Sequence, residues 1–66
     1  MENREYAVTV RCCCDVSYRT VVLADCEKAA SRKASREARA SGMSPLEVEE
    51  VSTDATTLDY FRRLLN

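Results

Sequence analysis

Residues 26–41, CEKAASRKASREARAS, decide the fold that we predict for this chain. Alanine recurs every fourth residue at Ala30, Ala34 and Ala38, and Ser41 follows three residues later. Because an α-helix turns by about 100° per residue, these small side chains share one helix face. The stretch therefore predicts a helix whose alanine face packs closely on a sheet.

The side of this helix opposite the alanines is basic. Like charges spaced i,i+4 destabilise a helix by a few tenths of a kcal/mol each, so this face costs local stability and suggests a use. Only Glu27 and Glu37 oppose the cations. We predict that five cations form the partner-binding surface: Lys28, Arg32, Lys33, Arg36 and Arg39. All of them except Lys33 lie within about a quarter of the helix circumference.

The residues that flank this helix predict its ends. Asp25 suits the N-cap, and Gly42, the only glycine, suits the C-cap. Ser44 and Pro45 then break the chain.

Two strands are expected before the helix. Residues 6–14 alternate, with one face formed by Tyr6, Val8, Val10 and Cys12 and the other by Ala7, Thr9 and Arg11. Residues 17–24 are rich in β-branched and aromatic side chains, and residues 15–17 form the expected turn. Because residues 21–23 are all apolar, two registers stay open: either Val21 and Leu23 face the helix, or Val22 does.

A third strand and a second helix are expected after the first helix. In residues 46–51, Leu46 and Val48 are predicted to point inward, with Glu47 and Glu49 outward. Thr56 or Thr57 is predicted to cap the last helix, and Arg62 and Arg63 suit its C-terminal end. Its apolar stripe consists of Leu58, Phe61, Leu64 and Leu65.

These elements predict one α+β domain over residues 1–66, a small two-layer sandwich of order β-β-α-β-α. Its three-stranded, mainly antiparallel sheet carries the alanine-rich helix, and the third strand lies beside the first, parallel to the second. A domain of 66 residues is marginally stable alone, so a second copy or another partner is a reasonable expectation.

Catalysis and cofactors are not expected. Histidine is absent and a single glycine cannot build a phosphate-binding loop. Glu49 and Glu50 are adjacent in a predicted strand and should point to opposite faces, so they do not form a carboxylate pair. We therefore expect a protein that is not an enzyme.

The four cysteines form no C-x-x-C pair, and no metal site is expected. In the predicted strand, Cys13 points away from Cys12 and Cys14. The predicted hairpin separates Cys12 from Cys26 by roughly 20 Å, and both are expected to be small buried side chains. A thiol-dependent module, acting by redox chemistry or metal binding, stays an alternative.

The basic face has three interpretations: a solvated surface that only aids solubility, or a surface for one of two classes of target. Docking on an acidic protein surface is favoured because no aromatic side chain accompanies the cations for base stacking. The acidic stretch at residues 45–59 would also repel a nucleic acid. The alternative is a nucleic-acid-binding accessory domain that uses the same face. No membrane-spanning or targeting segment is visible, so the cytoplasm is the expected compartment.

Three stretches of the sequence resemble the DpnD/PcfM-like small proteins. They are EYAVTV at residues 5–10, RTVVLAD at residues 19–25, and EKAA at residues 27–30, into which the second stretch leads. The resemblance covers about residues 5–51 and implies a strand–strand–helix–strand fold. The resemblance also implies an origin on a phage or mobile element. The family has no established activity that could be assigned to this chain. Size and layout are similar to phage anti-CRISPR inhibitors, which implies binding to a host protein or nucleoprotein complex.

Overall fold

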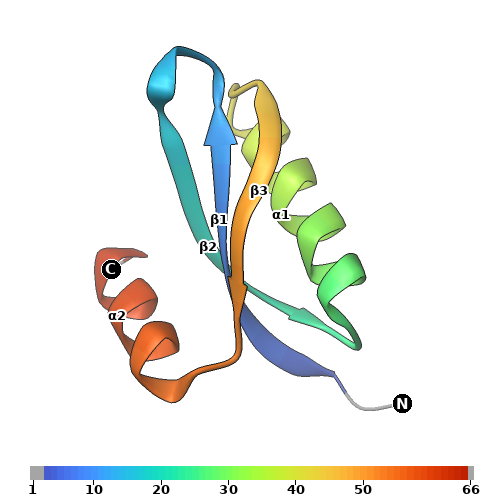
Figure 1. Cartoon of the computed structure of the whole chain (residues 1–66), viewed down its shortest axis with the longest axis vertical. Helices are drawn as coiled ribbons and strands as arrows, with labels where there is room; N and C mark the ends of the chain where they lie inside the picture. The colour runs from blue at the N-terminus through green and yellow to red at the C-terminus, as the bar shows by residue number, and fades with distance from the viewer. Residues whose placement is uncertain (1–2, 66) are drawn as a thin grey trace.

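Three strands of the chain form a single sheet with β1 (Arg4–Cys12) at its centre (Figure 1). The computed structural model describes residues 3–65. β2 (Ser17–Ala24) and β3 (Pro45–Ser52) flank β1, and both pair with it antiparallel, so they run parallel to each other. The predicted β-β-α-β-α order, the strand order and the bounds of β2 are confirmed.

The helix α1 (Glu27–Ala40) covers one face of this sheet. Its Ala30, Ala34 and Ala38 are fully buried and let the helix backbone approach the strands closely. On the β2 side Val22 belongs to this core, which settles the register that the sequence left open. The predicted inward face of β1 is confirmed, since all four of its side chains are buried there: Tyr6, Val8, Val10 and Cys12.

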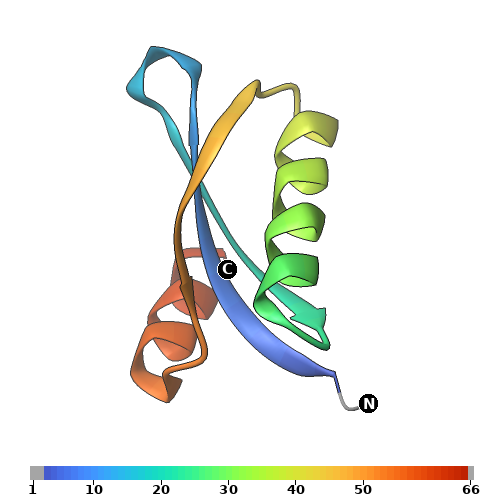
Figure 2. The same ribbon diagram turned by 45° about the vertical axis from the view of Figure 1, so that its right-hand side comes forward.

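The second helix, α2 (Ala55–Leu65), lies on the opposite face of the sheet and adds a partial third layer (Figure 2). Leu58 and Phe61 are buried against Ala7. The last two leucines of the predicted apolar stripe stay about half exposed, because the sheet offers α2 little more than Ala7 and Val21 to cover. Neither described helix is long and apolar enough to cross a bilayer.

Two irregularities in β3 change which side chains point inward. Thr9 pairs with Glu50 but Val10 pairs with Val48, so Glu49 is an extra residue in β3. A second shift of the pairing register follows further along the same two strands. Such bulges interrupt the alternation of faces. The second shift leaves Leu46 63% exposed, so the prediction that Leu46 points inward is wrong. Val48 points inward as predicted, and Val51 also packs against the core.

The N-terminal ends of both helices differ from the predictions. Cys26 keeps an extended backbone, so α1 begins at Glu27 and Asp25 lies one residue too early to cap it. α2 is capped by Asp54 instead of a threonine: the amide of Thr57 donates to Asp54 Oδ2 at 3.1 Å. This carboxylate satisfies one of the free N–H groups at the helix start.

The turn between β1 and β2 also begins earlier than predicted. β1 ends at Cys12, and a short 3-10 turn, η1 (Cys13–Asp15), follows it. Cys14 and Asp15 have φ of 65° and 58°, values that reverse the chain and cannot continue a strand. The predicted strand through Cys14 and the turn at residues 15–17 are therefore wrong.

Gly42 ends α1 as predicted. Its φ is +87°, its amide donates to the carbonyl of Arg39 at 3.0 Å, and the amide of Met43 donates to the carbonyl of Ala38 at 3.0 Å. These two bonds are those of a Schellman motif, which favours glycine because other residues are strained at positive φ.

Replacing Gly42 with alanine is expected to lower the free energy of unfolding by about 1 kcal/mol. No atom lies within 4 Å of the added Cβ, so the loss comes from backbone strain alone. Urea denaturation followed by circular dichroism measures it. Ser41→Ala, at an exposed neighbour with φ of −84°, is the control and should stay near the parent value. Equal midpoints for G42A and the parent chain would contradict the assignment.

Candidate functional site

The basic face of α1 points away from the sheet, because the buried alanines occupy the opposite side of the helix. All five predicted binding residues are exposed. Arg32, Arg36 and Arg39 line a shallow groove of about 390 Å³ together with Ser31 and Ser35. We call this hollow the arginine groove. The structure thus brings three of the five predicted residues together.

The other two cations lie outside the arginine groove. Lys28 is exposed but does not line it. Lys33 turns toward β2, where its ammonium group donates to the backbone carbonyl of Leu23. The predicted surface of five cations is therefore a compact set of three arginines with a lysine on either side of it.

The arginine groove has no internal counter-charge. Across residues 3–65, the cations found in ion pairs are Arg11, Arg62 and Arg63, and none of these belongs to α1. The nearby acid Glu37 is held toward β2 instead: its Oε1 accepts a hydrogen bond from the hydroxyl of Thr20 at 2.9 Å. The arginine side chains consequently keep their charge available for an external acid.

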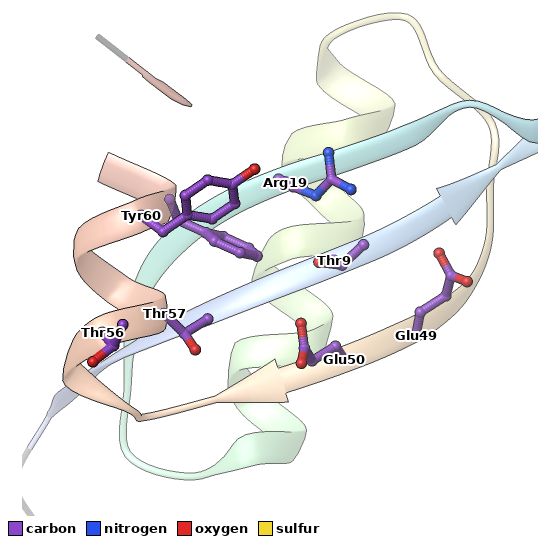
Figure 3. A pocket seen from close by; sticks show the side chains of 8 residues that line it. Thr9, Arg19, Glu49, Glu50, Thr56, Thr57 and Tyr60 are labelled. Carbon is purple, nitrogen blue, oxygen red and sulfur yellow. The ribbon is translucent and has the colours of Figure 1, made fainter. Parts of the chain in front are cut away.

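A second hollow lies on the opposite side of the sheet, between the strands and α2 (Figure 3). Its volume is about 560 Å³. We call it the α2 groove. Side chains from all three strands and from α2 line it: Thr9, Arg19, Glu49, Glu50, Thr56, Thr57, Tyr60 and Phe61.

Sequence reasoning missed the α2 groove because it placed Glu49 and Glu50 on opposite faces of a regular strand. The bulge at Glu49 overturns that prediction, and both carboxylates line the same groove. No turn residue or glycine in residues 46–51 marks the bulge, so the sequence holds no local pattern that would have revealed it.

One row of polar side chains crosses the floor of the α2 groove. Thr9 on the central strand pairs with Arg19 on one side and with Glu50 on the other. Thr9 is only 8% exposed, and its hydroxyl makes no hydrogen bond to the part of the chain that the structure describes. The other buried threonine, Thr20, does have a partner in Glu37. The hydroxyl of Thr9 is thus left for an occupant of the groove.

The cysteines lie mostly at one end of the molecule and are all free thiols. Cys12 is buried, with its Sγ 3.9 Å from Met43 Sδ, as predicted for a small core side chain. Cys26 is exposed, so the prediction that it is buried is wrong; its position before the first turn of α1 turns it to solvent. Between residues 3 and 65, no three histidine, cysteine or acidic side chains are arranged to hold a metal ion.

Two ion pairs link the central strand β1 to α2 and to β3. Arg62 on α2 binds Glu5 on β1, and this hydrogen bond and charge raise the pKa of Arg62 above its usual value. Arg11 pairs with Glu47 across β1 and β3 at 2.5 Å. Both pairs are about half exposed, so each contributes little to stability.

Comparison with known protein families, with curated proteins and with solved structures gives no match for this chain. The arginine groove and the α2 groove are therefore the basis on which its function is inferred.

Proposed function

We propose that this chain is a small interaction protein without enzymatic activity, which binds an acidic surface of a partner protein through the arginine groove. The observation that carries the proposal is that Arg32, Arg36 and Arg39 line one groove without a carboxylate partner among residues 3–65. The partner would be a host protein or nucleoprotein complex in the cytoplasm, as for a phage-encoded inhibitor.

The chemistry of arginine supports a protein target. A guanidinium group presents its donors in a planar fork that pairs with a carboxylate through two parallel hydrogen bonds. The alanine face holds α1 tightly on the sheet, so the three arginines sit on a rigid support. Less conformational entropy is then lost on binding.

A nucleic acid is the second candidate, because Ser31 and Ser35 add hydroxyl groups that suit phosphate oxygens beside the arginines. Against it, no aromatic side chain lines the arginine groove for base stacking. Such binding would also weaken steeply with salt.

Exchange of Arg32 and Arg36 for glutamate is expected to abolish the complex that the tagged chain forms in cells. The double change reverses two of the three charges in the groove, and both side chains are exposed, so the fold should survive. Affinity purification with and without nuclease is the measurement, and circular dichroism checks the fold.

The matched control reverses two exposed arginines elsewhere, Arg4 and Arg63, and should keep the complex. If the complex survives R32E/R36E, the arginine groove is not the binding surface. If nuclease alone dissolves it, the target is a nucleic acid.

A further inference from the structure

We propose that the α2 groove binds a free α-amino acid, with its ammonium group at Glu49 and Glu50 and its carboxylate at Arg19. The groove lies on the opposite face of the sheet from α1. The inference is therefore independent of the proposed function of the arginine groove.

The two carboxylates supply the first step. The bulge in β3 brings Glu49 and Glu50 into one groove, and no cation of residues 3–65 forms an ion pair with either. Both carboxylates thus lack a cationic partner, and an ammonium group, which has three N–H donors, would donate hydrogen bonds to them.

Arg19 decides between a zwitterion and a simple cation. It stands in the same row as Thr9 and Glu50, yet it makes no ion pair with either glutamate of the groove. Its positive charge would repel an amine that carries no acid, whereas it would attract the carboxylate of an amino acid. The groove therefore favours a ligand that bears both charges.

The spacing of the row suits the main-chain end of an amino acid. Neighbouring strands lie about 4.8 Å apart, which places the backbones of Arg19 and Glu50 about 10 Å apart across β1. The nitrogen and carboxylate oxygens of an α-amino acid are about 3 Å apart. Side chains stand roughly perpendicular to a sheet, so the ends of Arg19 and Glu50 keep a comparable separation, and a ligand with a hydrogen bond of about 2.9 Å at each end spans about 9 Å.

The centre of the row is already prepared for a polar ligand. Thr9 is 8% exposed and its hydroxyl, which lines the groove, has no partner within the described chain (Figure 3). No buried side-chain oxygen or nitrogen among residues 3–65 lacks a partner, so this hydroxyl is open to the groove, where it can donate a hydrogen bond to a ligand or accept one from it. This feature is independent of the glutamates and indicates the same place.

The wall formed by α2 indicates the ligand's side chain. Tyr60 is 56% exposed and meets Phe61 edge to face, with ring centroids 6.1 Å apart. An aromatic or large apolar side chain would add a further favourable contact there. The volume of about 560 Å³ lies within the range of about 300–1,000 Å³ that is common for small-molecule sites.

Titration of the labelled protein with L-phenylalanine, followed by amide NMR shifts, tests the proposal. We expect saturable shifts at Thr9 and Arg19. Two analogues remove one charge each: phenethylamine lacks the carboxylate, and N-acetyl-phenylalanine lacks the ammonium group. Each should bind at least about tenfold more weakly, the loss expected for one charge-assisted hydrogen bond.

Variants locate the binding. Glu50→Gln and Thr9→Val should each weaken L-phenylalanine binding several-fold, and Glu27→Gln, an exposed change on α1, should not. Equal binding of phenethylamine and L-phenylalanine would overturn the zwitterion assignment. So would unchanged binding by Glu50→Gln, or the absence of groove shifts with a panel of L-amino acids covering each side-chain class at millimolar concentration.

Discussion

Replacing Phe61 with alanine is expected to remove most of the stability of this protein. Phe61 is 4% exposed and is the largest side chain between α2 and the sheet, where it packs with Leu58 and Ala7. Truncation of a buried phenylalanine costs about 3–5 kcal/mol. A domain of this size has rarely more than about 3–5 kcal/mol from its core, so the variant should be largely unfolded at 25 °C.

Urea denaturation by circular dichroism, with hydrogen exchange at the amide of Ala7, measures this effect. Leu64→Ala on the same helix is the control. Because Leu64 is 49% exposed, this variant should lose only a small fraction of the free energy of unfolding that F61A loses. If F61A loses only helical signal while the sheet keeps its exchange protection, α2 is an appendage and not part of the cooperative unit.

Replacing Ala34 with leucine is expected to have the second-largest effect. Ala34 is fully buried at the middle of the alanine face, where α1 contacts the sheet. Three extra carbon atoms would force the helix away from Val8 and Val22 or into strained rotamers. Such overpacking costs about 1–3 kcal/mol, which is a large part of the stability of so small a core.

Ala40→Leu provides the matched control for this change. Ala40 lies on the same helix but is exposed, so the same chemical substitution there meets no packed neighbour and should shift the urea midpoint little. Equal midpoints for A34L and A40L would show that the alanine face does not set the distance between α1 and the sheet. Loss of partner binding by A34L alone would further support a rigid α1 as the platform of the arginine groove.

The two grooves lie on opposite faces of the sheet. The small side chains on the inner face of α1 leave its cations outside, and the single layer of strands keeps them away from the acids of β3. One face thus presents three arginines, and the other presents two glutamates together with Arg19. The pattern would allow a partner on α1 and a ligand under α2 at the same time.

The sequence by itself determined the helix of residues 27–40, its alanine and arginine faces, and the second strand at residues 17–24. Helix faces follow from a local period of 3.6 residues, and the Schellman motif at Gly42 is equally local, so both can be predicted without knowing any partner. For the same reason the arginine groove could be predicted almost completely from residues 28–39.

Only the tertiary structure decided the rest. Whether Val21 or Val22 faced α1 depended on pairing with β1. The exposure of Leu46 and the placement of Glu49 and Glu50 in one groove depended on bulges in β3. A strand has a period of two, so one extra residue moves every later side chain to the other face. The α2 groove could not be predicted because its residues come from three strands and a helix, joined by contacts that no local pattern specifies.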